Sequence, residues 1–204
     1  MRRFAGFLLA FVLSACATAS FTTKSAATDA RLSNQHLYIY SMLDLRASDF
    51  GVSMVSAVHD QLRARLGQHG VTTEIVTYAD TLNGKPLTPQ NGTVRIPLEQ
   101  IISSHQAQEQ TFGASYRLIV MPASMQISDM GQSYDVNWVL IQIPSNRVVW
   151  SSTLQGSRTV WWSQNEDAMR RAMTFVDGVI AQMESSGLFG DATPTSTPSL
   201  APTT

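Results

Sequence analysis

Residues 37–43, Leu-Tyr-Ile-Tyr-Ser-Met-Leu, begin the stretch that decides the fold of this 204-residue chain. Such an almost unbroken apolar run is typical of a buried strand. From Asp49, expected as an N-cap, apolar residues recur at helical spacing until Gly70; they are Val52, Val55, Val58, Leu62 and Leu66. Residues 71–78 alternate with β-branched side chains and predict a second strand. Strand, helix and strand in this order predict a βαβ unit with a right-handed crossover.

The chain beyond this unit continues the same pattern. Turn residues fill 79–94, which predicts an exposed loop, and 96–112 predicts a second helix with Pro97 near its first turn. Three strands are then expected over residues 118–127, 134–143 and 147–159, the last two joined by a tight turn at Pro144-Ser145-Asn146. The middle strand carries apolar side chains on both faces near its end, so we expect it to be central and covered on both sides.

The last helix is the most clearly marked element. Ser163-x-x-Glu166 has the form of a capping box, and Gly187 provides a stop. Between them runs one apolar stripe, formed by Met169, Ala172, Met173, Val176, Val179, Ile180 and Met183. The order β-α-β-α-β-β-β-α predicts a single α/β domain with a mixed sheet over residues 37–189, packed as a two-layer or three-layer sandwich.

The segments on either side of this domain are expected to be flexible. Residues 16–36 are rich in Ala, Thr and Ser and predict a tether with an r.m.s. reach of about 25 Å. Residues 190–204 are a Pro/Thr/Ser-rich tail, which cannot bury enough apolar surface to order itself.

Residues 1–15 have the three parts of a secretory signal peptide. Arg2 and Arg3 precede an apolar run over residues 4–13, and Leu13-Ser14-Ala15-Cys16 supplies small residues for cleavage. The run is too short to span a membrane, which takes about 20 residues. An ordinary secretory leader, with Cys16 present by coincidence, is the alternative.

The four residues ending at Cys16 resemble the lipobox of bacterial lipoproteins. The resemblance implies cleavage before Cys16, a diacylglycerol on its sulfur (palmitate is a common acyl chain) and acylation of its freed amine. Ala17 follows, where an aspartate would mark inner-membrane retention. The resemblance therefore implies a lipid-anchored protein on the periplasmic face of the outer membrane. Acylation would use the only thiol of the chain, leaving no disulfide.

Charge excludes some classes of partner. The chain carries 14 Lys and Arg against 15 Asp and Glu, a net charge of −1, with no basic block. Nucleic acid and anionic lipid headgroups are therefore poor partners.

Candidate chemistry is sparse. His36, His59, His69 and His105 lack the spacing of a metal site, so we expect no metal and no cofactor. Asp44, Arg46 and Asp49 follow the first strand, where they either line a small pocket or serve as capping and loop residues. No catalytic residue is assigned, and we expect a protein that is not an enzyme.

Tryptophans are the strongest candidates for a partner surface. Trp161 and Trp162 lie between the last strand and the last helix, and Trp150 lies in the strand before them. Tryptophan is a favoured anchor at protein interfaces, although rings in such a connection more often fold back over the core.

Three stretches resemble a group of periplasmic lipoproteins with an anticodon-binding-like α/β domain. They are residues 38–44, the passage 112–120 (Phe-Gly-Ala-Ser-Tyr-Arg-Leu-Ile-Val) and the turn 146–150 (Asn-Arg-Val-Val-Trp). The group includes the curli-secretion lipoprotein, the lipoprotein activator of a penicillin-binding protein, a flagellar lipoprotein and the N-terminal domain of the Tol translocation protein. The resemblance implies non-enzymatic docking on envelope assemblies or association into rings, and it brings no active site.

The sequence thus predicts a binding or scaffold protein of a cell-envelope assembly, held to outer-membrane lipid through Cys16 and bound to an envelope protein. One alternative is an oligomer-forming subunit of a secretion or export complex, with subunit contacts from the polar second helix and the 79–94 loop. Another is an envelope-glycan hydrolase, which needs two converging carboxylates. Asp44, Asp49, Glu74 and Asp135 are the candidates, and no spacing links them.

Overall fold

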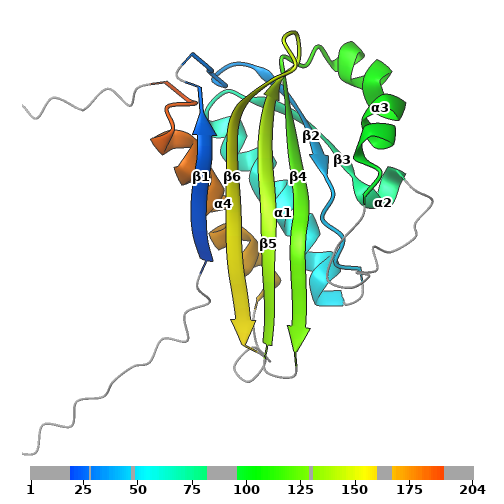
Figure 1. Cartoon of the computed structure of the whole chain (residues 1–204), viewed down its shortest axis with the longest axis vertical. Helices are drawn as coiled ribbons and strands as arrows, with labels where there is room; N and C mark the ends of the chain where they lie inside the picture. Colours follow the sequence, from blue (N-terminus) through cyan, green and yellow to red (C-terminus); the bar gives the residue numbers. More distant parts are fainter. Residues whose placement is uncertain are drawn as a thin grey trace, which may run out of the picture.

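The computed structural model describes residues 19–27, 29–46, 49–81, 96–128, 131–159 and 167–190. Within these ranges the chain forms one six-stranded sheet and four helices (Figure 1). The strands are β1 (Ala19–Ala26), β2 (His36–Ser41), β3 (Thr72–Thr77), β4 (Tyr116–Ser128), β5 (Gly131–Gln142) and β6 (Arg147–Thr159). The helices are α1 (Asp49–Gln68), α2 (Tyr78–Thr81), α3 (Leu98–Phe112) and α4 (Ala168–Ser185).

The sheet is mixed, in the order β1-β6-β5-β4-β2-β3. Strand β2 pairs in parallel with β3 and with β4, whereas β4, β5, β6 and β1 follow one another antiparallel. The parallel β2–α1–β3 unit and the α/β class predicted from the sequence are both confirmed. The tight turn between β5 and β6 is confirmed as well, with Asn146 at a positive φ of 48°.

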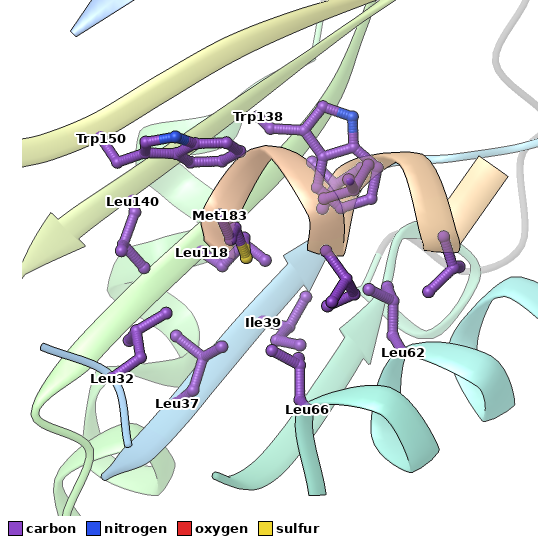
Figure 2. Close-up of a cluster of buried hydrophobic side chains, with 14 of the residues drawn as sticks. Leu32, Leu37, Ile39, Leu62, Leu66, Leu118, Trp138, Leu140, Trp150 and Met183 are labelled. Atoms are coloured by element: carbon purple, nitrogen blue, oxygen red, sulfur yellow. The ribbon is translucent and has the colours of Figure 1, made fainter. Parts of the chain in front are cut away.

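Helices α1 and α4 cover one face of the sheet and build the main core. Trp138 of β5 and Trp150 of β6 are completely buried there, and the Trp138 ring lies 5.5 Å from that of Phe175 on α4. Figure 2 shows leucines of β2, β4 and β5 converging with Leu62 and Leu66 of α1 beneath these rings. The two helices run parallel, because Gln61 contacts Met169, Arg65 contacts Asp177 and His69 contacts Glu184.

The second face of the sheet is only partly covered by a helix. Helix α3 packs over β2, where Tyr38, Tyr40 and Met42 form a smaller core with Ile101. The fold therefore has three layers at β2 and two layers at β5, β6 and β1. Figure 1 shows α1 and α4 behind these three strands and no described helix in front of them.

We call this uncovered surface the helix-free face. Strand register places on it Ser133, Asp135, Asn137, Val139 and Ile141 of β5, Val148, Ser151, Thr153 and Gln155 of β6, and Ser20 and Thr22 of β1. Most of these side chains are uncharged and polar, and the aliphatic ones gather toward the β5–β6 turn.

The flexible tether predicted over residues 16–36 is wrong from Ala19 onward. Residues 19–26 form β1, which pairs antiparallel with β6, and Ala30 and Leu32 are buried. A Ser/Thr-rich segment has little apolar periodicity, but β6 supplies the backbone hydrogen bonds and Phe21 supplies the packing. A Cβ on Gly178 of α4 would lie 2.3 Å from the Phe21 ring, so a glycine there admits this contact.

The predicted apolar faces of two helices are confirmed at most positions and differ from the structure at a few. Val52 of α1 is 50% exposed, and Gly51 and Met54 are buried instead. On α4, Met169 and Met173 are 44% and 39% exposed, while Phe175 is buried. The apolar stripes predicted from helical spacing for α1 and α4 thus include some residues that lie outside the surface covered by the sheet.

The ends of α4 and the cover of β5 also differ from expectation. Asp167 is the N-cap of α4, its carboxylate accepting the Met169 N–H, whereas Ser163 and Glu166 lie outside the described residues. Gly187 follows the helix at φ 74°, as predicted. Strand β5 is interior, as predicted, but Val139, Ile141 and Ile143 are only half-buried, because no described helix covers them.

Candidate functional site

A groove beside α3 is a concave site formed by described residues. Its volume is about 310 Å³, and it lies between α3, the start of β4 and the β5–β6 turn. Helix α3 contributes Ser103, Gln106 and Gln110, and the turn contributes Ile143 and Asn146. The groove thus joins the aliphatic end of the helix-free face, and its rim is made of neutral amides and a hydroxyl.

A buried ion pair forms part of the groove wall. Arg117 Nε donates to Glu109 Oε1 at 2.7 Å, and Arg117 Nη2 contacts Glu109 Oε2. The side chains of Glu109 and Arg117 are 3% and 13% exposed. The hydrogen bonds to Glu109 raise the pKa of Arg117 above its ordinary value, even though burial opposes this. Both carboxylate oxygens of Glu109 contact the Arg117 guanidinium, so Glu109 is not a free general base.

The local backbone brings these two residues together. Helix α3 ends at Gly113, whose φ of 72° suits glycine, and the N–H of Gly113 bonds to the helix carbonyls. The chain then reverses, so that β4 starts three residues later and returns Arg117 past the last turns of the helix. Glu109 lies two helical turns beyond Ile101, on the side of α3 that packs on the sheet.

Two tyrosines of β2 lie next to the pair. The Arg117 guanidinium lies 5.7 Å from the Tyr40 ring centroid, and Tyr38 Oη donates to Gln108 Oε1 at 3.4 Å. Burial, with the Glu109 charge adding to it, raises the pKa of the Tyr40 hydroxyl. That hydroxyl is buried, and Arg117 is the polar side chain that interacts with it. Because burial disfavours the phenolate, the Tyr40 hydroxyl stays protonated near neutral pH and does not act as a base.

His59 is also used for structure. It is buried, and its Nε2 lies 2.8 Å from Oγ of Ser41, which is equally buried at the end of β2. Burial is the main cause that lowers the pKa of His59 to about 4, with Arg63 adding to it. The pair resembles a serine–histidine dyad in composition only, because neither side chain reaches solvent.

Acid should therefore weaken the fold through His59. The imidazole stays neutral in the folded state down to about pH 4, whereas it protonates near pH 6.5 once unfolded. Its contribution to stability is present above pH 6.5 and is lost as the pH falls toward 4, by about 3 kcal/mol in all. In urea unfolding experiments, the free energy of unfolding of His59→Gln should fall less steeply between pH 6.5 and 4 than that of the wild type. His36→Gln, which keeps His59, should retain the wild-type decline; an unchanged slope in His59→Gln would contradict the assignment.

Asp44 and Arg46, two of the three residues predicted to line a pocket after the first strand, bind each other. Arg46 Nε and Nη2 donate to the two oxygens of Asp44 at 2.8 and 2.9 Å, which raises the pKa of Arg46. The Asp44 side chain is only 2% exposed, so this pair fixes the loop after β2. Asp49 is exposed in the first turn of α1. No group of three His, Cys, Asp or Glu side chains in the described ranges is arranged to hold a metal ion.

The prediction that Trp150 belongs to a partner surface is wrong. Its side chain is fully buried under α4, and its Nε1 donates to Ser186 Oγ at 3.1 Å. A bulge next to it turns Val149 and Trp150 inward and leaves Val148 exposed. Trp161, Trp162 and Cys16 lie outside the described residues.

Sequence reasoning missed the Glu109–Arg117 pair. The second helix was predicted to be polar, and only the spacing of eight residues between Ile101 and Glu109 places the two on one side of it. None of the helices in the described ranges is both long enough and apolar enough to cross a membrane.

Comparison with known proteins gives a fold likeness only. No protein-family model matches the chain, and no curated protein matches it. Two crystal forms of the PelC dodecamer from Paraburkholderia phytofirmans match with TM-scores of 0.48 and 0.46 at 18% identity, covering 80% of this chain and 96% of PelC. The lipoprotein GNA1162 from Neisseria meningitidis matches with a TM-score of 0.40 at 12% identity, covering 74% and 99%. At these levels, the likenesses do not assign a function to this chain.

Proposed function

We propose that this protein is a lipid-anchored scaffold of the bacterial cell envelope, which binds a protein partner and is not an enzyme. The leader that ends at Cys16 supports the anchor on the periplasmic face of the outer membrane. The helix-free face supports the binding role, and it is the observation that carries the proposal. A sheet face without a helix layer, next to a groove, offers a rigid and broad platform for another protein.

The positions of the charged and nucleophilic groups support the non-enzymatic part of the proposal. Glu109 is bonded to Arg117, Asp44 to Arg46, and His59 to Ser41. Each of these groups is engaged in holding two elements or a loop together. The hydrolase alternative needs a second carboxylate across a cleft, and Glu109 is the one carboxylate among the residues that line the groove.

The aliphatic end of the helix-free face is the part that we expect to contact the partner. Val148 is 47% exposed and lies opposite Ile141 on the same face, beside Ile143 of the groove. Interface cores favour apolar side chains with few charges, and uncharged polar side chains such as those of Asn137 and Thr153 suit the rim.

Crosslinking in native membranes tests this surface. Val148→Asp should reduce recovery of the crosslinked partner by at least about tenfold, because a carboxylate would be buried in the contact. Val52→Asp is the matched control, since Val52 is equally exposed but lies on the helix layer, and it should leave recovery unchanged. Equal recovery from both variants would remove this face as the docking surface. Trp161→Ala and Trp162→Ala test, in the same assay, the sequence-based prediction for those residues.

A second function, an assembly-forming subunit, is favoured by one observation. Among the described strands, β1 is at the edge of the sheet and has β6 as its one partner, so its other side is open to a further strand. Light scattering of the acyl-free protein distinguishes the two functions, because a scaffold is monomeric and a subunit of this kind is an oligomer.

A further inference from the structure

The first strand begins three residues after the cysteine that we propose to be acylated. We propose that the end of the sheet where β1 begins lies against the bilayer, so that the groove beside α3 points away from the membrane. This inference rests on the proposed acylation of Cys16. It names the surface of the domain that meets lipid and fixes the orientation in which a partner finds the groove.

Covalent geometry sets the limit on separation. Only Ala17 and Thr18 stand between Cys16 and Ala19, so the two Cα atoms are at most about 11 Å apart, whatever the path of the chain. The acyl chains of Cys16 would lie within the leaflet. Ala19 pairs with Gly156 of β6, and Gly156 pairs with Tyr134 of β5. The start of β1, the last residues of β6 and the first residues of β5 are therefore held near the lipid together.

Helix α4 brings apolar side chains to the same end. Phe21 near the start of β1 meets Gly178, and Ala26 at its end pairs with Trp150, which bonds to Ser186. Strand and helix thus run in the same direction, and the first turns of α4 lie at the end where β1 begins. Met169 precedes Gly178 by nine residues and lies about 13 Å further along the helix toward the bilayer. Met169 and Met173 are two of the four large apolar side chains exposed in the described ranges.

The exposed side chains at this end of the sheet suit the headgroup layer. On the sheet, Ser20, Thr22, Ser133 and Gln155 are exposed and uncharged, and they can exchange hydrogen bonds between water and headgroups; at the start of α4, Asp167 and Arg170 are exposed and charged. The uncharged groups of the sheet can meet a bilayer without the large cost of desolvating a charge, whereas Asp167 and Arg170 keep that cost low only if they stay in the hydrated headgroup layer.

The opposite end of the sheet holds the groove. Asn146 of the groove precedes Gly156 by ten residues along an extended strand, a separation of about 33 Å. An upright sheet would therefore display the groove and Val148 well clear of the lipid, where an envelope partner can reach them.

Lipid-borne quenching tests the orientation on the full, acylated protein. Acylation leaves no natural thiol, so single cysteines in Gln155→Cys and Ser145→Cys take a fluorophore at one defined position each. In phosphatidylcholine vesicles that contain a headgroup-nitroxide lipid, we expect most of the fluorescence at position 155 to be lost and that at position 145 to be retained. Inserting 20 Gly/Ser residues between Thr18 and Ala19 gives an r.m.s. reach of about 25 Å and should abolish the difference.

The possible results distinguish the orientation of the domain from the acyl anchor. Vesicle-bound, acylated protein whose two positions are quenched equally, or whose position 145 is quenched more, overturns the orientation and leaves the anchor intact. Protein that neither sediments with vesicles nor carries acyl mass overturns the anchor, and the orientation with it.

Discussion

Replacing Glu109 by alanine is expected to lower the free energy of unfolding by about 3–5 kcal/mol. The change leaves the Arg117 guanidinium beside the Tyr40 ring with only 13% of its side chain exposed and no counter-charge from Glu109. An uncompensated buried charge costs far more than the pair itself contributes. Urea unfolding at neutral pH measures the loss directly.

Two further variants show whether the ion pair causes this effect. The double variant Glu109→Leu/Arg117→Leu removes both charges and should be more stable than Glu109→Ala, because no isolated charge remains buried. Asp60→Ala breaks the exposed pair between Asp60 and Arg63 and should change stability by less than about 0.5 kcal/mol. A Glu109→Ala variant as stable as Asp60→Ala would show that the pair is dispensable.

Cys16→Ser is expected to remove the protein from the outer membrane. A single acyl chain binds a bilayer only marginally, with about 0.8 kcal/mol contributed by each buried methylene, whereas three chains on one residue make attachment effectively permanent. A serine oxygen does not accept the diacylglycerol, so all of this free energy is lost at once. Fractionation of cells should move the protein from the membrane pellet to the soluble fraction, or leave it unprocessed.

Ala17→Asp is the matched variant for that experiment. In the lipoproteins that the leader resembles, an aspartate after the lipidated cysteine marks retention at the inner membrane. The variant should therefore remain anchored but change membrane, which separates loss of the lipid from loss of sorting. A Cys16→Ser protein that stays in the outer-membrane fraction would show that another part of the chain holds it there.

The parallel unit was predictable because its signals are local. The apolar run of β2, the periodic α1 and the alternating β3 follow one another in fewer than 50 residues, and each spans its element almost completely. Strand β1 was not predictable in this way. Its Ser/Thr composition is typical of a linker, and it becomes a strand because β6 offers a free edge more than 120 residues later in the chain.

The groove depends on contacts that no local pattern reports. Glu109 and Arg117 belong to different elements and meet because Gly113 ends the helix and reverses the chain. Trp150 illustrates the opposite error. A tryptophan near a strand end looks like an interface anchor, but a bulge in β6 places it under α4. Helical periodicity likewise identified most of the buried stripe of α4, but it included Met169 and Met173, which are exposed, and missed Phe175, which is buried.

Mass spectrometry of the N-terminal peptide, from protein isolated from the membranes of its native host, tests the anchored-scaffold account most directly. The account predicts a mature chain that begins at Cys16, with a mass increased by a diacylglycerol and an amide-linked acyl group. A peptide that retains Met1, or one in which Cys16 carries a free thiol, would contradict the anchor, and with it the envelope location and the orientation of the groove.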